Sequence, residues 1–342
     1  MACAMPSIPK TGNSLNAPVL EIQNLNVRFT TPDGEVAAVS DLSLTIGKGE
    51  CVGIVGESGS GKSQTFMAAM GLLARNGYAG GWATFGGINL LSAGEKILNG
   101  IRGDRLAMIF QDPMTSLTPH MKIGRQLTEV LVRHRRLSAA KARDQAIAML
   151  KRVQVPEPER RFTMYPHELS GGLRQRVMIA MALLCGPELI IADEPTTALD
   201  VTVQAQTLDL IRAAKDEMQT SVVLITHDLG VVAGLADRVA VMYAGRIVEI
   251  GDVRQIFNAP QHPYTKGLLA CTLRLDDPTT GALLTIPGQP PDLQHLPVGC
   301  AYHPRCFYAM DRCRAEIPAL LPASEGGATA CFLGDVSLKA AS

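Results

Sequence analysis

The sequence predicts an α/β fold built on a mixed central sheet, and three observations support this fold class. Short runs of apolar, strand-forming residues alternate with longer segments that carry helical periodicity. A Gly-rich loop that contains a lysine stands between a buried strand and a helix. A Pro-rich region that contains a group of four cysteines, between residues 300 and 331, follows the last strand-like run. We therefore expect an N-terminal antiparallel β subdomain, an inserted helical subdomain and a small Cys-containing C-terminal domain around the central sheet.

The whole chain has balanced charge and a large apolar content. Its 342 residues are 46% hydrophobic, which is enough for one large domain and a smaller one. The 32 basic and 32 acidic residues cancel, so the chain lacks the basic surplus typical of nucleic-acid binding. The longest uncharged apolar stretch, residues 177–187, is shorter than the roughly 20 residues of a membrane-spanning helix. Residues 1–18 resemble a loose tail more than a secretory signal, and we expect a cytosolic protein.

The first strand-like segments predict a small antiparallel sheet. Residues 19–22 and 25–29 are rich in strand formers, a Pro-Asp-Gly turn follows at 32–34, and residues 42–46 alternate between apolar and polar. This pattern is typical of strands that bury one face and expose the other.

A phosphate-binding loop follows this sheet. It reads Gly56-Glu57-Ser58-Gly59-Ser60-Gly61-Lys62-Ser63 and lies between a buried strand at 51–55 and a helix at 64–73 that begins with Gln64. The glycines let backbone amides turn toward a phosphate, Lys62 can reach the β and γ phosphates, and the Ser63 hydroxyl can ligate Mg²⁺. The helix N-terminus adds positive potential. The loop predicts binding of ATP or GTP, and an ordinary Gly-rich turn is the weaker interpretation.

Two further residues are candidate ligands at strand ends. Phe29 ends a strand where its ring could stack on a nucleotide base, although packing in the core explains it equally well. The apolar run 106–110 leads directly to Gln111, a polar side chain at the end of a buried strand. Residues 123–134 and 139–153 then show helical periodicity, so the segment of about 112–170 is predicted to be an inserted helical layer.

The start of the next helix is a second candidate anion site. Ser170 suits the N-cap position, and Gly171 and Gly172 allow another group to approach the backbone closely. Taken alone, an ordinary capped helix is the better interpretation, because Ser-Gly turns are common. The motifs that follow favour the anion site.

Charged and polar side chains follow two buried strands. The run 189–192 ends at Asp193 and Glu194, and the run 222–226 ends at His227. Ligands of open α/β sheets bind beyond the carboxyl ends of the strands, so Asp193 can hold Mg²⁺ and Glu194 can polarise an attacking water. Structural carboxylates are the weaker alternative. His227 gains functional weight from the same edge and could touch a γ-phosphate.

The composition changes after a closing hairpin, near residue 251. The segment 252–342 is Pro-rich and has little apolar material for a core. It contains Cys300, Cys306, Cys313 and Cys331, which match the four thiolates of one tetrahedral or cubane metal site. Spacings of five, six and seventeen intervening residues fit neither the usual zinc pattern nor the common ferredoxin runs, so zinc, iron-sulfur and free thiols stay open.

In chain order, these motifs resemble the ATPase subunit of an ABC transporter. The set comprises the phosphate loop, Gln111, LSGG at 169–172, the Asp193-Glu194 pair, Asp200 after Ala198-Leu199, and His227, and it spans residues 19–251. The strings FQDPMTSL (110–117), YPHELSGG (165–172) and IADEPTTALDVTVQAQ (191–206) resemble the dipeptide and oligopeptide importer branch. The strings HPYTKGLL (262–269), IPGQPPDL (286–293) and GCAYHPRCFYAMDRCR (299–314) extend this resemblance into the C-terminal domain.

The resemblance implies a role for each site residue. Two such subunits clamp two ATP molecules head to tail, and the phosphate loop of one meets the LSGG segment of the other. Glu194 is then the catalytic base, His227 the γ-phosphate switch, and Gln111 a ligand of Mg²⁺ together with Ser63 and Asp193. The implied ATP contacts are Phe29, residues 56–64, Ser170, Gly171, Gly172 and Asp200. Leu173 departs from the Gln of many relatives, but we expect little loss of function.

The resemblance also implies partners, a location and a cluster. The expected function is ATP hydrolysis that powers dipeptide or oligopeptide import, at the cytoplasmic face of the inner membrane. The expected partners are a homologous ATPase subunit in a heterodimer, two membrane-spanning permease subunits and a substrate-binding protein, without nucleic acid. The four C-terminal cysteines are implied to hold a [4Fe-4S] cluster, with zinc as the alternative.

Two other functions are disfavoured, and the cargo stays open. A soluble ABC ATPase that acts on nucleic acid, ribosomes or iron-sulfur assembly would carry tandem domains, coiled-coil insertions or a basic surface. A non-catalytic partner would lack residues such as Lys62, Glu194 or His227. The sequence does not distinguish a dipeptide, a longer peptide or a nickel chelate as cargo.

Overall fold

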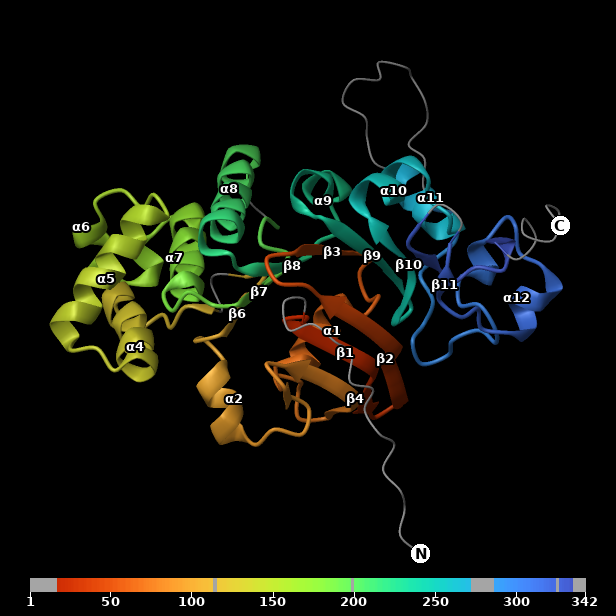
Figure 1. Cartoon of the computed structure of the whole chain (residues 1–342), viewed down its shortest axis with the longest axis horizontal. Helices are drawn as coiled ribbons and strands as arrows, with labels where there is room; N and C mark the ends of the chain where they lie inside the picture. Colours follow the sequence, from red (N-terminus) through yellow and green to blue (C-terminus); the bar gives the residue numbers. More distant parts are fainter. Residues whose placement is uncertain (1–16, 113–115, 198–199, 272–285, 324–325, 335–342) are drawn as a thin grey trace, which may run out of the picture.

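The strands form two sheets, and helix α1 (Lys62–Ala69) packs in the core between them. A computed structural model describes residues 17–112, 116–197, 200–271, 286–323 and 326–334. Within these residues the strands form a four-stranded sheet of order β2-β1-β4-β5 and an eight-stranded sheet of order β11-β12-β10-β9-β3-β8-β7-β6. The predicted α/β class with a mixed central sheet and an N-terminal antiparallel sheet is confirmed (Figure 1).

The strands of the smaller sheet are longer than the sequence pattern indicated. It contains β1 (Leu20–Thr31), β2 (Gly34–Ile46), β4 (Gly77–Phe85) and β5 (Ile88–Asn89). The two predicted short strands are one strand, β1, whose pairing with β2 shifts register between Ile22 and Leu25. Asn24 there has a left-handed backbone with φ of 48°, which explains why the apolar alternation is broken.

The larger sheet has a parallel centre and an antiparallel edge. Strands β3 (Cys51–Val55), β6 (Leu106–Ile109), β7 (Leu189–Asp193), β8 (Ser221–Ile225) and β9 (Arg238–Tyr243) pair in parallel, whereas β10 (Arg246–Asp252) pairs antiparallel with β9. The carboxyl ends of the parallel strands therefore meet at one edge, and the predicted site residues follow these ends.

Both faces of the central strands are covered, and their side chains divide between two cores. Val52 and Ile54 of β3 join the core that contains the β1–β2–β4 sheet and Phe66 of α1 (Lys62–Ala69). Cys51 and Val55 point into the opposite core, which the helices α7, α8 and α9 cover. This two-sided burial explains why these strands read as continuous apolar runs.

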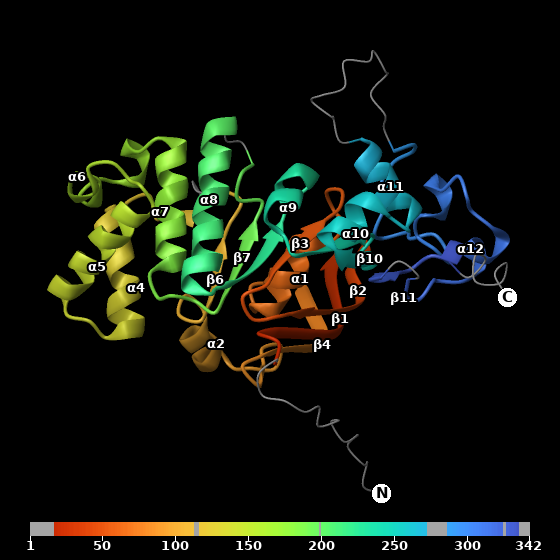
Figure 2. The ribbon, with the colours of Figure 1, turned by 45° about the horizontal axis from the view of Figure 1, so that its top comes forward.

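A group of helices lies at one end of the molecule. These are α4 (Ile123–Arg135), α5 (Ala139–Arg152), α6 (Pro158–Phe162) and α7 (Gly171–Leu183), preceded by α2 (Glu95–Ile101) and by the short helix η1 (Pro166–Glu168) before α7. Helices α8 (Val201–Met218), α9 (Leu229–Leu235), α10 (Val253–Asn258) and α11 (Pro263–Ala270) follow along the sheet. Figures 1 and 2 show α4 to α7 at the end opposite the C-terminal segments.

The C-terminal region adds to the central sheet. Its short strand β12 (Ala328–Thr329) pairs with β10, and β11 (Leu321–Pro322) pairs with β12. Tyr264 and Tyr302 are buried in the core of the central sheet, so the region packs on that core more extensively than its Pro-rich composition suggested. The short helices η2 (His303–Arg305) and α12 (Asp311–Ala315) complete this region. In the parts of the chain that the structure describes, no helix has the length and apolarity needed to span a membrane.

Candidate nucleotide-binding site

The phosphate-binding loop connects β3 to α1 with a backbone that depends on glycine. Gly56 has a φ of 153° and Gly61 a φ of 95°. A Cβ at Gly56 would collide with the Met242 carbonyl oxygen, and one at Gly61 with that of Ala38. Gly61 is the N-cap of α1 and provides no side-chain cap. The first amides of this helix therefore keep their donors for an anion.

Lys62 is buried within the loop. Its ammonium donates to the carbonyl oxygens of Gly56 at 2.7 Å and Glu57 at 3.0 Å. Burial lowers the pKa of Lys62, and the nearby carboxylates of Glu194 and Asp193 oppose that shift. The positive charge of Lys62 thus lies close enough to Asp193 and Glu194 to interact with both carboxylates.

The residues predicted to hold Mg²⁺ divide into two groups. The Ser63 hydroxyl donates to Oδ1 of Asp193 at 2.7 Å, across 130 residues of sequence. Burial raises the pKa of Asp193, and the hydrogen bond from Ser63 opposes that shift. One hydroxyl and one carboxylate in contact are the hard oxygen ligands that suit Mg²⁺. The Gln111 amide instead contacts Glu194, so the structure places it beside the predicted base.

Three side chains hold the carboxylate of Glu194. Its Oε2 accepts from Gln111 Nε2 at 3.1 Å and from Thr197 Oγ1 at 2.8 Å, and its Oε1 lies 3.3 Å from His227 Nδ1. Glu194 has a left-handed backbone with φ of 45°, a conformation that costs energy in a residue other than glycine. Sequence reasoning named Gln111, Glu194 and His227 but missed Thr197, whose only signal was its place after the acidic pair.

The predicted contacts of the second anion site lie at helix starts. The Ser170 hydroxyl caps α7 by accepting from the Leu173 amide at 3.4 Å, and Gly171 beside it is exposed. Gly172 faces Val203 of α8, where a Cβ would lie 3.1 Å from a methyl group. Figures 1 and 2 show β6 and β7 of the central sheet between α7 and α1.

Two other predicted ATP contacts also have structural roles. Asp200 caps α8, because its Oδ1 accepts from the Val203 amide at 2.9 Å. The preceding Ala198 and Leu199 lie outside the described residues. Phe29 is half-buried and packs against the core of the antiparallel sheet, next to Gly77 of β4. Core packing, one of its two interpretations, is thus part of its role. In the loop, Ser58 and Gly59 are exposed, whereas Ser60 is buried and Gln64 is half-buried.

The four C-terminal cysteines face one small cavity but do not form a ready metal site. Cys300, Cys306, Cys313 and Cys331 line a cavity of about 20 Å³, room for about one water molecule. Burial raises the pKa of Cys300 and Cys306, and that of Cys331 to about 11, which favours protonated thiols. In the described part of the chain, no three His, Cys, Asp or Glu side chains are arranged to hold a metal ion. The predicted [4Fe-4S] or zinc centre is therefore not supported.

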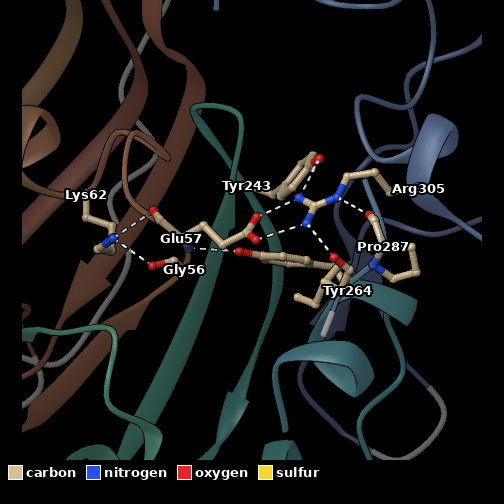
Figure 3. Close-up of polar contacts among 8 residues, drawn as sticks. Gly56, Glu57, Lys62, Tyr243, Tyr264, Pro287 and Arg305 are labelled. Atoms are coloured by element: carbon tan, nitrogen blue, oxygen red, sulfur yellow. Dashed lines mark hydrogen bonds and ion pairs between the residues drawn. The ribbon is translucent and has the colours of Figure 1, made fainter. Parts of the chain in front are cut away.

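The phosphate loop also contacts the C-terminal region, which sequence reasoning did not anticipate. The carboxylate of Glu57 pairs with Arg305, and the Glu57 amide donates to the hydroxyl of Tyr264 (Figure 3). No sequence signal linked these residues, because they lie more than two hundred positions apart.

Comparisons with known proteins agree with this geometry. Residues 39–197 match the family of ABC transporters, and residues 248–313 match the C-terminal region of oligopeptide and dipeptide transporters. The chain is 56% identical to the oligopeptide transport ATP-binding protein OppD of Salmonella typhimurium, over 92% of this chain and 93% of that protein. It is 50% identical to the dipeptide transport ATP-binding protein DppD of Bacillus subtilis, over 93% of this chain and 95% of that protein.

Solved structures of ATP-binding cassettes share the fold. A dimeric, post-hydrolysis cassette bound to ADP and phosphate superposes with a TM-score of 0.62 at 28% identity, over 69% of this chain and 99% of that one. A cassette of a Clostridium perfringens ABC transporter complex gives a TM-score of 0.58 at 26% identity, over 71% of this chain and 91% of that one. The chain therefore belongs to the ATP-binding subunits of ABC transporters, a family of ATPases, and within it to the oligopeptide and dipeptide transport branch.

Proposed function

We propose that this chain hydrolyses ATP to power the import of dipeptides or oligopeptides, as a peripheral subunit at the cytoplasmic face of the inner membrane. The observation that carries the proposal is the meeting of Lys62, the Ser63–Asp193 pair and the held Glu194 carboxylate at one sheet edge. The near full-length similarity to peptide transport ATP-binding proteins supports the cargo class.

The proposal gives each group a task in the reaction. The amides of the loop and of α1 bind the phosphates, and Lys62 exchanges its loop carbonyls for β and γ phosphate oxygens. Ser63 and Asp193 would hold Mg²⁺, which when bound neutralises charge on those oxygens. Glu194 orients and polarises a water whose oxygen attacks the γ-phosphorus, while the bond to the β–γ bridging oxygen breaks and ADP leaves. Contacts with Gln111, Thr197 and His227 keep the Glu194 carboxylate oriented toward this water.

A second ATPase subunit completes the proposed site. Ser170, Gly171 and Asp200 are exposed at the starts of α7 and α8, where a partner's nucleotide can reach them. We expect a homologous subunit in a heterodimer, in which Ser170, Gly171 and Gly172 meet the ATP held by the partner's loop. Two permease subunits and an external substrate-binding protein would complete the importer.

The Glu194→Gln variant tests the chemical step. It keeps the side-chain shape but removes the charge that polarises water, so we expect retained ATP binding and a loss of hydrolysis of at least about a hundredfold. ATP binding is measured by calorimetry, and phosphate release is measured with the permease subunits present. Glu188→Gln is the matched control, because Glu188 pairs with Arg105 just before β7. Undiminished hydrolysis in Glu194→Gln would remove Glu194 from this role.

Peptide uptake tests the transport assignment. Cells that lack this chain should stop accumulating a labelled tripeptide, and the intact chain should restore uptake whereas Glu194→Gln should not. Normal peptide uptake in the deleted strain, with loss of another solute, would refute the peptide cargo and keep the ATPase.

We also propose that the four C-terminal cysteines form one metal site in the assembled protein, as a [4Fe-4S] cluster with zinc as the alternative. All four cysteines line one cavity, which supports a single shared site, but the thiols must lose their protons and move closer together, and the cavity must widen, before they can hold a metal centre. The chain purified without oxygen should contain about four irons and absorb visible light. Cys306→Ser should lose both, whereas Cys271→Ser should keep them. A metal-free, colourless chain would contradict the proposal.

A further inference from the structure

The phosphate loop is bonded to a buried arginine of the C-terminal region. The two terminal nitrogens of Arg305 donate to the two carboxylate oxygens of Glu57, at 2.7 and 3.0 Å, across 248 residues of sequence. The side chains are only 5% and 25% exposed, respectively. Two parallel hydrogen bonds between a guanidinium and a carboxylate fix orientation as well as distance. Figure 3 shows this pair between the loop and the C-terminal segment.

Arg305 is itself held in place by its surroundings. Its Nε donates to the carbonyl of Pro287 at 2.8 Å, and one terminal nitrogen reaches the hydroxyl of Tyr243 at 3.4 Å. The guanidinium also lies over the rings of Tyr243 and Tyr302. A buried arginine with such fixed neighbours is not a loose surface charge, so it can act as an anchor for Glu57.

Glu57 is fixed at its amide and its carbonyl as well as at its side chain. Its N–H donates to the Tyr264 hydroxyl at 2.8 Å, and its carbonyl accepts from the Lys62 ammonium at 3.0 Å. The residue is followed by exposed Ser58 and lies between Gly56 and Gly59, both with positive φ. Glycines on both sides leave this part of the loop many conformations, so outside contacts are needed to select one.

The turn that carries Arg305 is bonded to the cysteine-lined cavity. Arg305 ends η2, whose first residue, His303, donates its amide to the Cys300 carbonyl at 2.9 Å. The next residue, Cys306, donates its amide back to the His303 carbonyl at 3.2 Å. Cys300 and Cys306 thus belong to the same hydrogen-bonded turn that places the guanidinium.

We propose that Arg305 is a positioning residue for the phosphate-binding loop: through Glu57 it holds the loop in the shape that binds the triphosphate, and it links the cysteine-lined region to nucleotide affinity. The inference rests on the proposed function, because it concerns the same ATP site. The path has two contacts, from Arg305 to Glu57 and from Glu57 to Lys62. Coupling between two sites is reciprocal. If an ordered Arg305 turn favours nucleotide binding, then nucleotide binding favours the ordered turn by the same free energy.

The test measures nucleotide affinity in the full-length chain. A non-hydrolysable ATP analogue with Mg²⁺ is titrated by calorimetry into the wild type, Arg305→Gln, Arg305→Lys, Glu57→Gln and the Glu57→Gln/Arg305→Gln double variant. We expect the Arg305→Gln dissociation constant to rise about tenfold. Arg305→Lys should recover part of this loss, because it keeps the charge without the two-pronged contact. In the Glu57→Gln background, Arg305→Gln should change the constant less than about twofold.

Two controls separate this proposal from simpler explanations. Arg312→Gln removes a C-terminal arginine that pairs with Glu316 and lies over the ring of Phe332, and it should leave affinity unchanged because neither partner belongs to the phosphate loop. Lys62→Ala should abolish binding, and if it does not, the ATP site itself is wrong. Wild-type affinity in Arg305→Gln, an equal loss in Arg312→Gln, or additive losses in the double variant would overturn the positioning role.

Hydrogen exchange keeps the proposal testable if Arg305→Gln fails to fold. In the wild type, the analogue should slow exchange of the amides at residues 303–306 several-fold, because binding orders the turn through Glu57. The peptide that contains α12, in the same region, serves as the reference. Unchanged exchange at 303–306 on saturation would overturn the proposal.

Discussion

At the residue scale, the orientation of the predicted catalytic base depends on several contacts with its side chain. Glu194 has a left-handed backbone, and its carboxylate is contacted by Gln111, Thr197 and His227. The left-handed backbone costs energy, and the three contacts fix the direction of the carboxylate. A base with a fixed direction needs little rearrangement when water attacks.

The Thr197→Val variant tests this. It keeps the shape of the side chain but removes the donor to Glu194 Oε2, and a hydrogen bond to a charged group contributes about 1.5–3 kcal/mol. We expect hydrolysis to fall about ten- to 150-fold while nucleotide affinity is retained. Steady-state kinetics of the assembled transporter gives kcat, and calorimetry gives the dissociation constant. Thr163→Val is the control, since Thr163 bonds the Arg160 carbonyl at the surface. Equal kcat values for the two variants would contradict the role of Thr197.

His262 makes the stability of the fold depend on pH. It is fully buried, its Nδ1 accepts from the Tyr264 amide at 3.0 Å, and burial lowers its pKa from 6.5 to about 3. Between these values the unfolded chain binds a proton that the folded chain does not, so stability falls as pH decreases below 6.5. The loss from pH 7.5 to pH 5 should be about 2 kcal/mol from this residue.

Urea unfolding of wild type and His262→Asn at both pH values measures this loss. Asn can accept the same amide hydrogen bond but does not titrate, so the variant should lose the His262 contribution to the pH dependence whatever its absolute stability. The same pH dependence in both proteins would show that His262 is not its source.

The difference between predicted and missed site residues follows from what a linear pattern contains. The sequence identified Lys62, Ser63, Asp193 and Glu194, because loop spacing and strand ends mark them locally. Ser63 and Asp193 were each predicted as ligands of Mg²⁺, and the structure brings their side chains into contact. Arg305 carries no such mark, since its meeting with Glu57 depends on how the chain packs after more than two hundred further residues.

At the element scale, helices were easier to predict than a strand that is interrupted by glycines. The predicted helices at 123–134 and 139–153 agree with α4 and α5 to within a residue at each end. In contrast, β4 (GYAGGWATF) was missed, because its glycines interrupt the alternation that marks a half-buried strand. Its pairing with β1 supplies the backbone contacts that its own sequence does not predict.

A helix cap gives a prediction at this scale. Asp228 caps α9, and its Oδ1 accepts from the amides of Gly230 at 2.8 Å and Val231 at 3.3 Å. Asp228→Ala should lower the free energy of unfolding by about 1 kcal/mol. Because α9 packs on β3, a frayed α9 would also weaken packing on the central sheet. Asp209→Ala, in the exposed middle of α8, should cost less than about 0.5 kcal/mol. Urea midpoints measure both, and equal midpoints would show that the cap is dispensable.

At the scale of the whole molecule, the C-terminal region is built into the nucleotide-binding fold. Strand β12 extends the central sheet through β10, and Arg305 bonds the phosphate loop. The predicted boundary near residue 251 stays a prediction, yet these contacts cross it. Composition could not reveal them, because the packing uses tyrosines and backbone pairing in place of a run of aliphatic residues.

Tyr302 tests whether both regions unfold together. Its ring is 5% exposed and contacts Tyr243 of β9 edge to face, with ring centres 5.2 Å apart. Tyr302→Ala removes a large buried side chain and should lower the unfolding free energy by about 3 kcal/mol. Because its partners belong to the central sheet, the fluorescence of Trp82 in β4 and the overall circular dichroism should shift to lower urea together. Tyr308→Ala is the control, since Tyr308 is 60% exposed. The contrary outcome is a partial transition in circular dichroism at low urea while Trp82 fluorescence keeps its wild-type midpoint. The C-terminal region would then be a separate folding unit. In that case Arg305 could separate from Glu57 while the ATPase domain stays folded.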